Sequence, residues 1–183
     1  VTVAGRSMPL PAPFHVLATQ NPLEQEGTYP LPEAQLDRFL LQIDVGYPDV
    51  AAERQMLIAT TGTEEEKPVQ MMTAEELAAG QRLIRAVPVG DGVVQAILNL
   101  VRNGRPETTA LPEVKTHVAW GPGPRASQAL MLASRARALL DGRLSPSIDD
   151  VIALAPPILR HRMAVNFAAR AEGVGVEDIV KRL

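Results

Sequence analysis

The chain has 183 residues, 46% of them apolar and only 3% aromatic, which predicts a buried core of aliphatic side chains. It contains no cysteine, which excludes disulfides and cysteine-ligated metals. The net charge is −3 and no lysine or arginine run is present. We therefore expect no nucleic-acid partner, because phosphate binding leaves a clustered basic patch.

Membrane insertion, secretion and metal binding are not indicated either. No apolar stretch approaches the roughly 18 residues that cross a bilayer, and no signal-peptide pattern is present. We expect a cytoplasmic protein without a membrane span. His15, His117 and His161 lie far apart, and none pairs with a carboxylate at metal-ligand spacing, so no metal site is predicted. Because the chain begins without Met, in a strand-like pattern, we interpret it as a piece of a longer protein.

Residues 1–48 have an α/β pattern. The segment VTVAG (1–5) alternates like a strand at a sheet edge. The short apolar run FHVLAT (14–19) is typical of a buried strand, and LLQIDVGYP (40–48) is a further strand candidate. A short helical piece precedes the latter. The order strand, loop, short helix, strand is typical of an α/β fold.

From residue 49 onward the pattern is helical and predicts a bundle of about six helices. Capping boxes at Thr73–Glu76 and Ser147–Asp150 mark two helix starts. Pro156 and Pro157 are expected to end a helix, with another short helix following. Residues 104–119 are expected to be an irregular connector. Helices are predicted at 50–62, 73–87, 91–104, 124–142, 147–155 and 176–183.

Two helix faces are predicted to turn toward the core. On residues 91–104 the face consists of Val93, Ile97, Leu100 and Val101. On residues 124–142 it consists of Ala129, Ala133, Ala136 and Leu140, and Gly142 is expected to stop the helix.

The chain lacks the phosphate-binding sequence of P-loop proteins. None of its three lysines follows a glycine, so no Gly-x-x-x-x-Gly-Lys-Ser/Thr is present. No apolar strand ends in Asp-Glu to hold magnesium. Residues 121–126 spell Gly-x-Gly-x-x-Ala, but prolines interrupt the glycines and no strand follows the helix. We therefore reject a dinucleotide-binding fingerprint.

The segment ATQNP (18–22) places Asn21 directly after a strand candidate, where α/β folds bind ligands. An amide side chain there can orient water toward a phosphate, as Gln does in some GTPases. The alternative is an ordinary turn, because Asn before Pro favours turn initiation.

The segment EGTYPLPEAQLDRF (26–39) holds Arg38 on a stiff arm. Its prolines restrict the backbone, and Pro32 suits a first helical position. Glu33 in the first turn and Arg38 at the end both have the charge that a helix dipole favours there. The alternative is a surface ion-pair region formed by Asp37 and Arg38.

The segment WGPGPRAS (120–127) places Arg125 in the first turn of a helix begun by Pro124. A positive charge there opposes the helix dipole at a cost of about 0.3–1 kcal/mol. The unpaired amides of that turn already favour anions, so the arginine sharpens a preference for phosphate. The alternative is that Arg125 folds back onto a nearby carboxylate.

Three segments together resemble the later part of the MoxR-type AAA+ ATPases: ATQNP, EQEGTYPLPEAQLDRFLLQIDVGYP and GPGPRASQAL. The start of the chain resembles that family's hairpin and strand before the first sensor, and DDVIALAPPILRHRM resembles its lid. The resemblance implies an α/β fragment of a P-loop AAA+ core over residues 1–48. An all-α helical-bundle lid then follows over residues 49–183, so the chain is mainly α overall.

The resemblance also implies roles for individual residues. Asn21 is similar to the sensor 1 residue that positions the attacking water. Arg38 is similar to the arginine finger that reaches a neighbouring subunit's γ-phosphate. Arg125 is similar to the sensor 2 arginine of the lid, which contacts the bound nucleotide. Such proteins form hexameric rings, hydrolyse ATP with Mg²⁺ and remodel or mature client protein complexes, with partners that carry von Willebrand factor A domains.

One departure from the family is Gly123, where a serine is more frequent, so a possible helix cap is lost. We expect the P-loop and the magnesium-holding acidic pair N-terminal to residue 1, and no ATP hydrolysis by this chain alone. The alternative to an ATPase is a non-enzymatic helical module that binds a protein partner.

Overall fold

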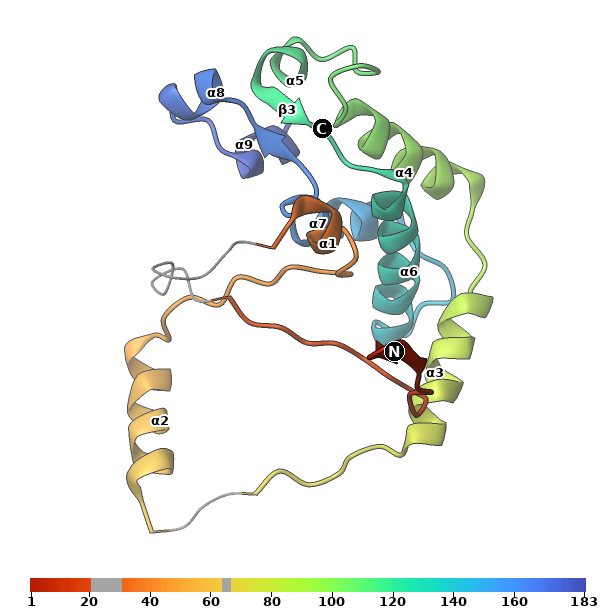
Figure 1. Ribbon diagram of the computed structural model, residues 1–183, viewed down its shortest axis with the longest axis vertical. Coiled ribbons are helices and arrows are strands. Elements are labelled where there is room, and N and C mark those ends of the chain that lie inside the picture. The colour runs from red at the N-terminus through yellow and green to blue at the C-terminus, as the bar shows by residue number, and fades with distance from the viewer. Residues whose placement is uncertain (21–30, 64–66) are drawn as a thin grey trace. The chain divides into compact units, whose positions relative to one another are not determined.

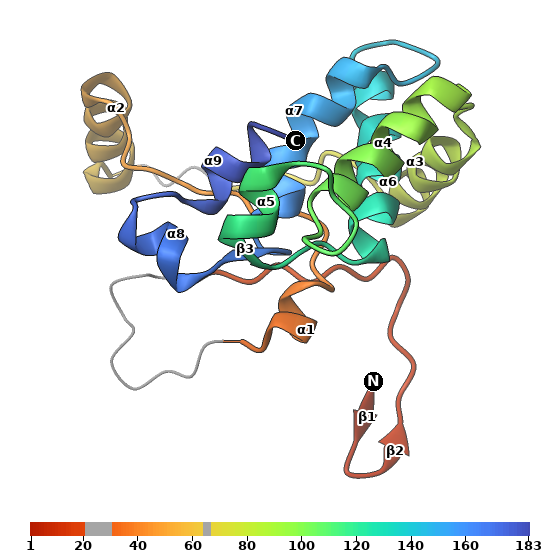
Figure 2. The ribbon, with the colours of Figure 1, turned by 90° about the horizontal axis from the view of Figure 1, so that it is seen from above.

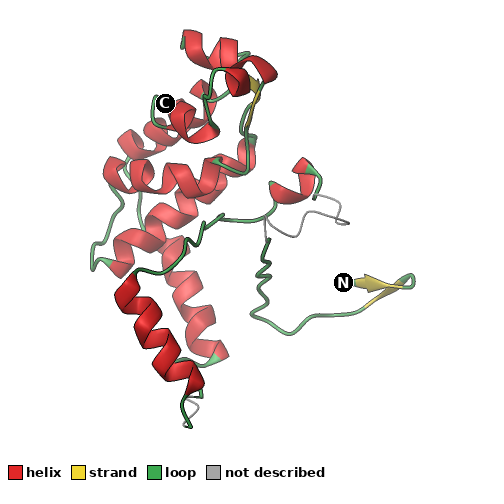
Figure 3. Cartoon of the chain, turned by 90° about the vertical axis from the view of Figure 1, so that its left-hand side faces the viewer, coloured by secondary structure: helices red, strands yellow, loops and turns green. Residues whose placement is uncertain are grey.

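A computed structural model describes residues 1–20, 31–63 and 67–183 (Figure 1). Helices dominate these residues, as the colouring of Figure 3 shows, so the expected mainly α composition is confirmed. The chain divides into two compact units, residues 1–15 with 43–80 and residues 16–42 with 81–183. The functional boundary after residue 48 stays a prediction.

The first unit begins with an antiparallel hairpin of β1 (Thr2–Val3) and β2 (Arg6–Ser7). Its two turn residues, Ala4 and Gly5, have positive φ values of 48° and 77°. Positive φ at both positions is the geometry that a tight two-residue hairpin requires. The strand expected in VTVAG is therefore present.

Side-chain caps start the next two helices. The carboxylate of Asp49 accepts a 2.8 Å hydrogen bond from the amide of Ala52, and α2 (Val50–Thr61) follows. Before α3 (Ala74–Ala86), the amide of Thr73 donates to Glu76 at 2.7 Å. The amide of Glu76 donates back to the Thr73 hydroxyl, which confirms the predicted capping box. The hydrogen bond from the Thr73 backbone lowers the pKa of Glu76.

The second unit is a bundle of helices with one small sheet (Figure 2). The central helix α6 packs against α4 and α7, and α7 packs against α9. Its helices are α1 (Glu33–Leu36), α4 (Asp91–Asn103), α5 (Pro112–His117), α6 (Pro124–Leu140), α7 (Ile148–Leu159), α8 (Phe167–Ala171) and α9 (Val176–Val180). Strands β3 (Val118–Trp120) and β4 (Ala164–Val165) pair antiparallel. The core includes Ile97, Val101, Leu130, Ile158, Leu159 and Ile179.

The predicted core faces are right for α4 and partly wrong for α6. In α4, Val93, Ile97 and Val101 are buried, and Leu100 is partly buried against the core. In α6, Ala129 and Ala133 are buried, but Leu140 is 88% exposed. Because α6 packs against both α4 and α7, it buries a wide face rather than one narrow stripe. That face also contains Ala126, Leu130, Ser134 and Ala138.

Two helix expectations are wrong. The segment expected to be an irregular connector contains α5 and the start of β3. Pro156 and Pro157 lie inside α7, which continues to Leu159. Two prolines inside a helix cost roughly 6 kcal/mol, at about 3 kcal/mol each. Complete burial of Ile158 and Leu159 offsets most of this cost, because each contributes about 1.5–3 kcal/mol.

The strands expected at 14–19 and 40–48 are not formed. Neither segment pairs with a strand in the part of the chain that the structure describes. Val16 and Leu17 are 61% and 97% exposed, so the expected burial is also absent. A short apolar run is compatible with a strand, but only a partner strand makes it one.

The start of α7 is fixed by a buried carboxylate. Ser147 and Asp150 form the predicted capping box. Arg143 donates two hydrogen bonds of 2.7 Å to the Asp150 carboxylate. These bonds hold the pKa of Asp150 down to about 2 against the opposing effect of burial. Arg143 thereby ties the turn after α6 to the first turn of α7.

A close approach of two backbone segments fixes the entry to α6. A Cβ atom added to Gly121 would lie 2.7 Å from the Cα of Arg105 and in contact with the carbonyl oxygen of Gly104. The side chain of Arg105 also donates from Nε to the carbonyl of Pro122 at 2.7 Å. The end of α4 therefore holds the segment that leads into α6.

No single helix among the described residues has the length and apolar character to cross a membrane, and α3 and α4 meet that test only as a pair bent by 94°.

We predict that Gly121→Ala lowers the free energy of unfolding by about 1–3 kcal/mol, because the obstructing atoms belong to backbone. The matched control is Gly92→Ala in α4, where a Cβ meets no atom within 4 Å. This change should be neutral or stabilising by up to ~1 kcal/mol. Urea unfolding measures both. Equal effects of the two changes would contradict the proposed close approach.

Candidate functional site

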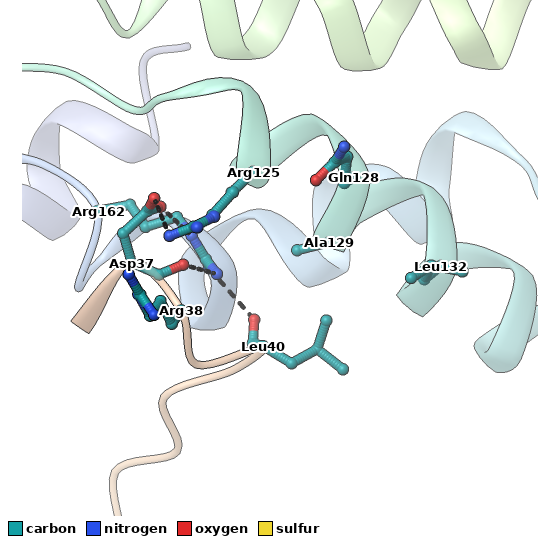
Figure 4. A pocket seen from close by; sticks show the side chains of 8 residues that line it. All are labelled: Asp37, Arg38, Leu40, Arg125, Gln128, Ala129, Leu132 and Arg162. Carbon is teal, nitrogen blue, oxygen red and sulfur yellow. Dashed lines mark hydrogen bonds and ion pairs between the residues drawn. The ribbon is translucent and has the colours of Figure 1, made fainter. Parts of the chain in front are cut away.

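A pocket of about 240 Å³ lies within the second unit (Figure 4). The segment after α1, the first turns of α6 and the residue Arg162 after α7 contribute its walls. Ligand pockets that enclose a whole drug-sized molecule usually measure ~300–1,000 Å³, so this one is smaller than such a site. It is lined by Asp37, Arg38, Leu40, Arg125, Gln128, Ala129, Leu132 and Arg162.

The carboxylate of Asp37 pairs with two arginines from different elements. Its Oδ1 accepts a 3.0 Å bond from Nε of Arg162, and its Oδ2 lies 3.4 Å from Nη1 of Arg125. The Arg162 side chain is 2% exposed, whereas that of Arg125 is 48% exposed. Asp37 therefore joins a buried cation to one that faces solvent.

Arg162 uses its whole guanidinium group. Besides the bond to the Asp37 carboxylate, Nη2 donates to the carbonyl of Asp37 at 3.0 Å and to that of Phe39. Nη1 donates to the carbonyl of Leu40 at 3.2 Å and to that of Ile158 at 2.7 Å. Burial lowers the pKa of Arg162, and the hydrogen bond to Asp37 opposes that shift. A buried charge is stable when it is paired and hydrogen-bonded in this way.

His161 contacts the same segment. Its Nε2 lies 3.2 Å from the carbonyl oxygen of Phe39. Because a carbonyl can only accept, Nε2 carries the hydrogen in this contact. Its Nδ1 is buried without a hydrogen-bond partner among the described residues. Burial, and then the charge of Arg162, lower the pKa of His161.

Arg38 follows a single helical turn. Its amide donates to the carbonyl of Gln35 at 3.1 Å, and the amide of Phe39 donates to that of Leu36 at 3.0 Å. Pro32 precedes the helix and Glu33 lies in its first turn, as expected. The Arg38 side chain is exposed and makes no hydrogen bond or ion pair with another described residue, and no dashed line reaches it in Figure 4. Its backbone is therefore ordered while its charged group can meet a ligand.

Arg125 occupies the first turn of α6, as predicted. Pro124 begins this helix, and Gly123 precedes it without a side-chain cap. The contact between Arg125 and Asp37 corresponds to the alternative in which the arginine folds onto a carboxylate. The lining residues together carry a net two positive charges, so this pairing leaves the pocket favourable to an anion.

The structure brings together two of the three residues singled out in the sequence. Arg38 and Arg125 line one pocket although they are far apart in the chain. Asn21 lies outside the described residues. Sequence reasoning missed the contributions of Arg162 and His161. The only signal was the run Arg160, His161, Arg162 between apolar residues, and this run does not show which of its side chains is buried.

Comparison with known proteins agrees with this architecture. Residues 1–41 match the family described as "ATPase family associated with various cellular activities (AAA)". Residues 112–183 match the "AAA lid domain". The two matches contain all the charged residues of the pocket and define the class of protein as AAA+.

Whole-chain similarities narrow the class. The chain is 39% identical to Chaperone MoxR1 of Mycobacterium tuberculosis, over 100% of its own length and 48% of that protein. It is 40% identical to the uncharacterized protein YeaC of Bacillus subtilis, over 100% of its length and 55% of YeaC. A crystal structure of a protein from Cytophaga hutchinsonii matches with a TM-score of 0.92 and 33% identity, over 100% of this chain and 56% of that one.

The chain belongs to the MoxR-type AAA+ ATPase family and corresponds to its C-terminal portion. It spans about half the length of the curated relatives it matches.

We predict that the stability of the chain falls as the pH is lowered through the ordinary pKa of histidine. The folded state keeps His161 neutral, so below that pKa the unfolded state binds more protons and is favoured. In His161→Gln, an amide Nε2 can still donate to Phe39 but does not titrate. The dependence of the unfolding free energy between about pH 5 and 8 should flatten.

Urea unfolding over that pH range tests this prediction. The charged groups around His161 are Arg162, Asp37 and Arg160. The control is His117→Gln, because His117 pairs with Glu172 at 3.2 Å and is not among the groups that shift the pKa of His161. An unchanged slope in His161→Gln would show that another group causes the dependence.

Proposed function

We propose that the full-length protein hydrolyses ATP with Mg²⁺ and uses the energy to remodel or mature client protein complexes. The observation that carries this proposal is the convergence of Arg38 and Arg125 on one positively charged pocket. Phosphoryl transfer needs positioning and charge stabilisation rather than covalent chemistry from the protein. Two arginines at one pocket suit that need.

In this proposal, Arg38 is the arginine finger, Arg125 is the sensor 2 arginine, and Asn21 is the sensor 1 residue that positions water. The resemblance of Arg38 to an arginine finger implies that it acts on a nucleotide held by a neighbouring subunit of a hexameric ring, and we include this in the proposal. Because Arg125 lines the same pocket, we infer that it acts on that same nucleotide and hence also in trans.

The pairing of Arg125 with Asp37 represents the ligand-free state of this proposal. A surface ion pair between partly exposed groups is worth under about 1 kcal/mol. A nucleotide phosphate bears more negative charge than a carboxylate and offers more acceptor oxygens. The phosphate can therefore replace Asp37 at Arg125 at little cost.

The wider roles rest on the family. The name of the M. tuberculosis relative supports a chaperone-like activity. We propose a cytoplasmic protein whose residues 1–48 complete the ATPase core and whose residues 49–183 form the lid. Partners with von Willebrand factor A domains belong to the same proposal.

We predict that Arg38→Ala in the full-length protein lowers kcat for ATP about 10³-fold or more, because the finger stabilises charge only in the transition state. Nucleotide affinity should remain close to wild type. Steady-state hydrolysis and equilibrium nucleotide binding measure the two effects. The control is Arg182→Ala, which removes an exposed arginine that pairs with Glu113. Normal turnover in Arg38→Ala would exclude the finger assignment.

We predict that Arg125→Ala in the full-length protein also lowers kcat. Rings mixed from two inactive variants show whether Arg125 acts on its own subunit's nucleotide or on its neighbour's. A subunit whose P-loop lysine is replaced cannot hydrolyse ATP but still presents an intact Arg125 to its neighbour. If Arg125 acts in trans, mixing the two inactive variants restores hydrolysis. Failure of the mixture, under conditions where Arg38→Ala is rescued, would place Arg125 at its own subunit's nucleotide.

The alternative is the non-enzymatic helical module. The full-length sequence separates the two proposals, because an ATPase requires a Gly-x-x-x-x-Gly-Lys-Ser/Thr N-terminal to residue 1. The 183-residue chain by itself should show no ATP turnover. Turnover that remained with this chain through successive purification steps would contradict the proposed division of the site between subunits.

A further inference from the structure

We propose that Arg162 is a positioning residue that clamps the backbone on both sides of Arg38 and so fixes the place from which this side chain acts. The clamp is a property of the chain, and its effect on turnover rests on the proposed ATPase function. Arg162 does not contact the nucleotide in this proposal. It acts through the segment 37–40.

The acceptors of Arg162 surround Arg38 in the sequence. One nitrogen, Nη2, donates to the carbonyls of both Asp37 and Phe39, the residues on either side of Arg38. Nη1 continues the series with the carbonyl of Leu40 at 3.2 Å (Figure 4). One guanidinium group thus holds the peptide unit before Arg38 and two peptide units after it.

The clamp is attached to the C-terminal end of α7. The last carbonyls of a helix have no partner within it. Here the carbonyl of Ile158 accepts from Arg162 at 2.7 Å, and that of Pro157 accepts from the amide of Gln42 at 2.8 Å. Positive charge is favourable at this helix end. The segment 37–42 is therefore held at one end by Arg162 and at the other by the carbonyl of Pro157 in α7.

Only arginine has the geometry for this role. Its planar group presents five N–H donors in a fixed fork, and all three nitrogens of Arg162 are used. Lysine has three donors on a single atom and cannot reach the carboxylate of Asp37 and the separate carbonyls together. Arg162→Lys therefore keeps the charge but loses the clamp.

The rate of hydrolysis depends steeply on where a catalytic side chain is placed. A catalytic group displaced by about 1 Å can cost on the order of 10²-fold in rate. The Arg38 side chain makes no hydrogen bond or ion pair with another described residue, so its backbone largely sets its position. Asp37 also pairs with Arg125 at 3.4 Å in the ligand-free state, but this weak contact is not part of the clamp.

The clamp itself is tested in the full-length protein without nucleotide, by hydrogen exchange of the amides of Arg38, Phe39 and Gln42, each of which donates to a main-chain carbonyl. We expect exchange at least about tenfold faster in Arg162→Lys, because these amides open with the segment. The matched control is Arg143→Gln, which removes two 2.7 Å bonds to buried Asp150 away from the pocket. It should leave the exchange of the three amides unchanged. Unchanged exchange in Arg162→Lys would overturn the clamp, whether or not the protein is an ATPase.

The effect on Arg38 is tested by kinetics. We expect Arg162→Lys to lower kcat about 10- to 100-fold, with KM within about twofold of wild type, and Arg143→Gln to leave kcat within about twofold. Mixing Arg162→Lys subunits with subunits that lack the P-loop lysine should restore hydrolysis, because the latter present a correctly placed Arg38. A variant that is merely less well folded would not be restored.

The outcomes separate this inference from the proposed function. No hydrolysis by the wild-type ring, or a fully active Arg38→Ala, would overturn the ATPase proposal, and the exchange experiment would still decide the clamp. The positioning role alone would be overturned by a normal kcat in Arg162→Lys, provided that the wild-type ring hydrolyses ATP and that mixing rescues Arg38→Ala. If Arg162→Lys does not fold, Arg162→Gln serves in both experiments, because a neutral amide costs less to bury than a charge and its one nitrogen can reach at most two of the five acceptors. Unchanged exchange and kcat in that variant would overturn the inference.

Discussion

The buried guanidinium of Arg162 is the interaction on which the site depends. A charge that is 2% exposed is stable only because each of its nitrogens has an acceptor. These acceptors come from two places in the chain, the end of α7 and the segment after α1. Asp37 also pairs with Arg125, which lies in the first turn of α6. The segment after α1 and the two consecutive helices α6 and α7 therefore meet at the pair of Asp37 and Arg162.

The features that the sequence predicted well are local. The capping boxes at Thr73–Glu76 and Ser147–Asp150 form as expected, and Gly142 ends α6 with a positive φ of 73°. Each depends on residues within a few positions of one another. The features predicted wrongly depend on partners elsewhere. The apolar run at 14–19 has no strand to pair with among the described residues, and α7 passes through two prolines because its last residues are buried.

The same distinction applies to the site. Arg38 and Arg125 could be singled out because each lies at a helix end, where charge has a local meaning, and because both lie in family motifs. Arg162 could not be assigned a partner, because four of its five acceptors are backbone carbonyls. Every residue has such a carbonyl, so no sequence pattern marks the ones that a distant arginine will use. Only the fold brings them together.

The two arginines that pair with Asp37 differ in the free energy that is lost when the contact breaks. The contact with Arg125 is 3.4 Å long and half exposed, so its loss costs under about 1 kcal/mol. The contact with Arg162 is 3.0 Å long, buried on the arginine side and supported by further bonds to the same segment. An anion that enters the pocket can therefore take Arg125 from Asp37 while Arg162 keeps its hold. This asymmetry allows one carboxylate to release an arginine to a ligand while the backbone at Arg38 stays in place.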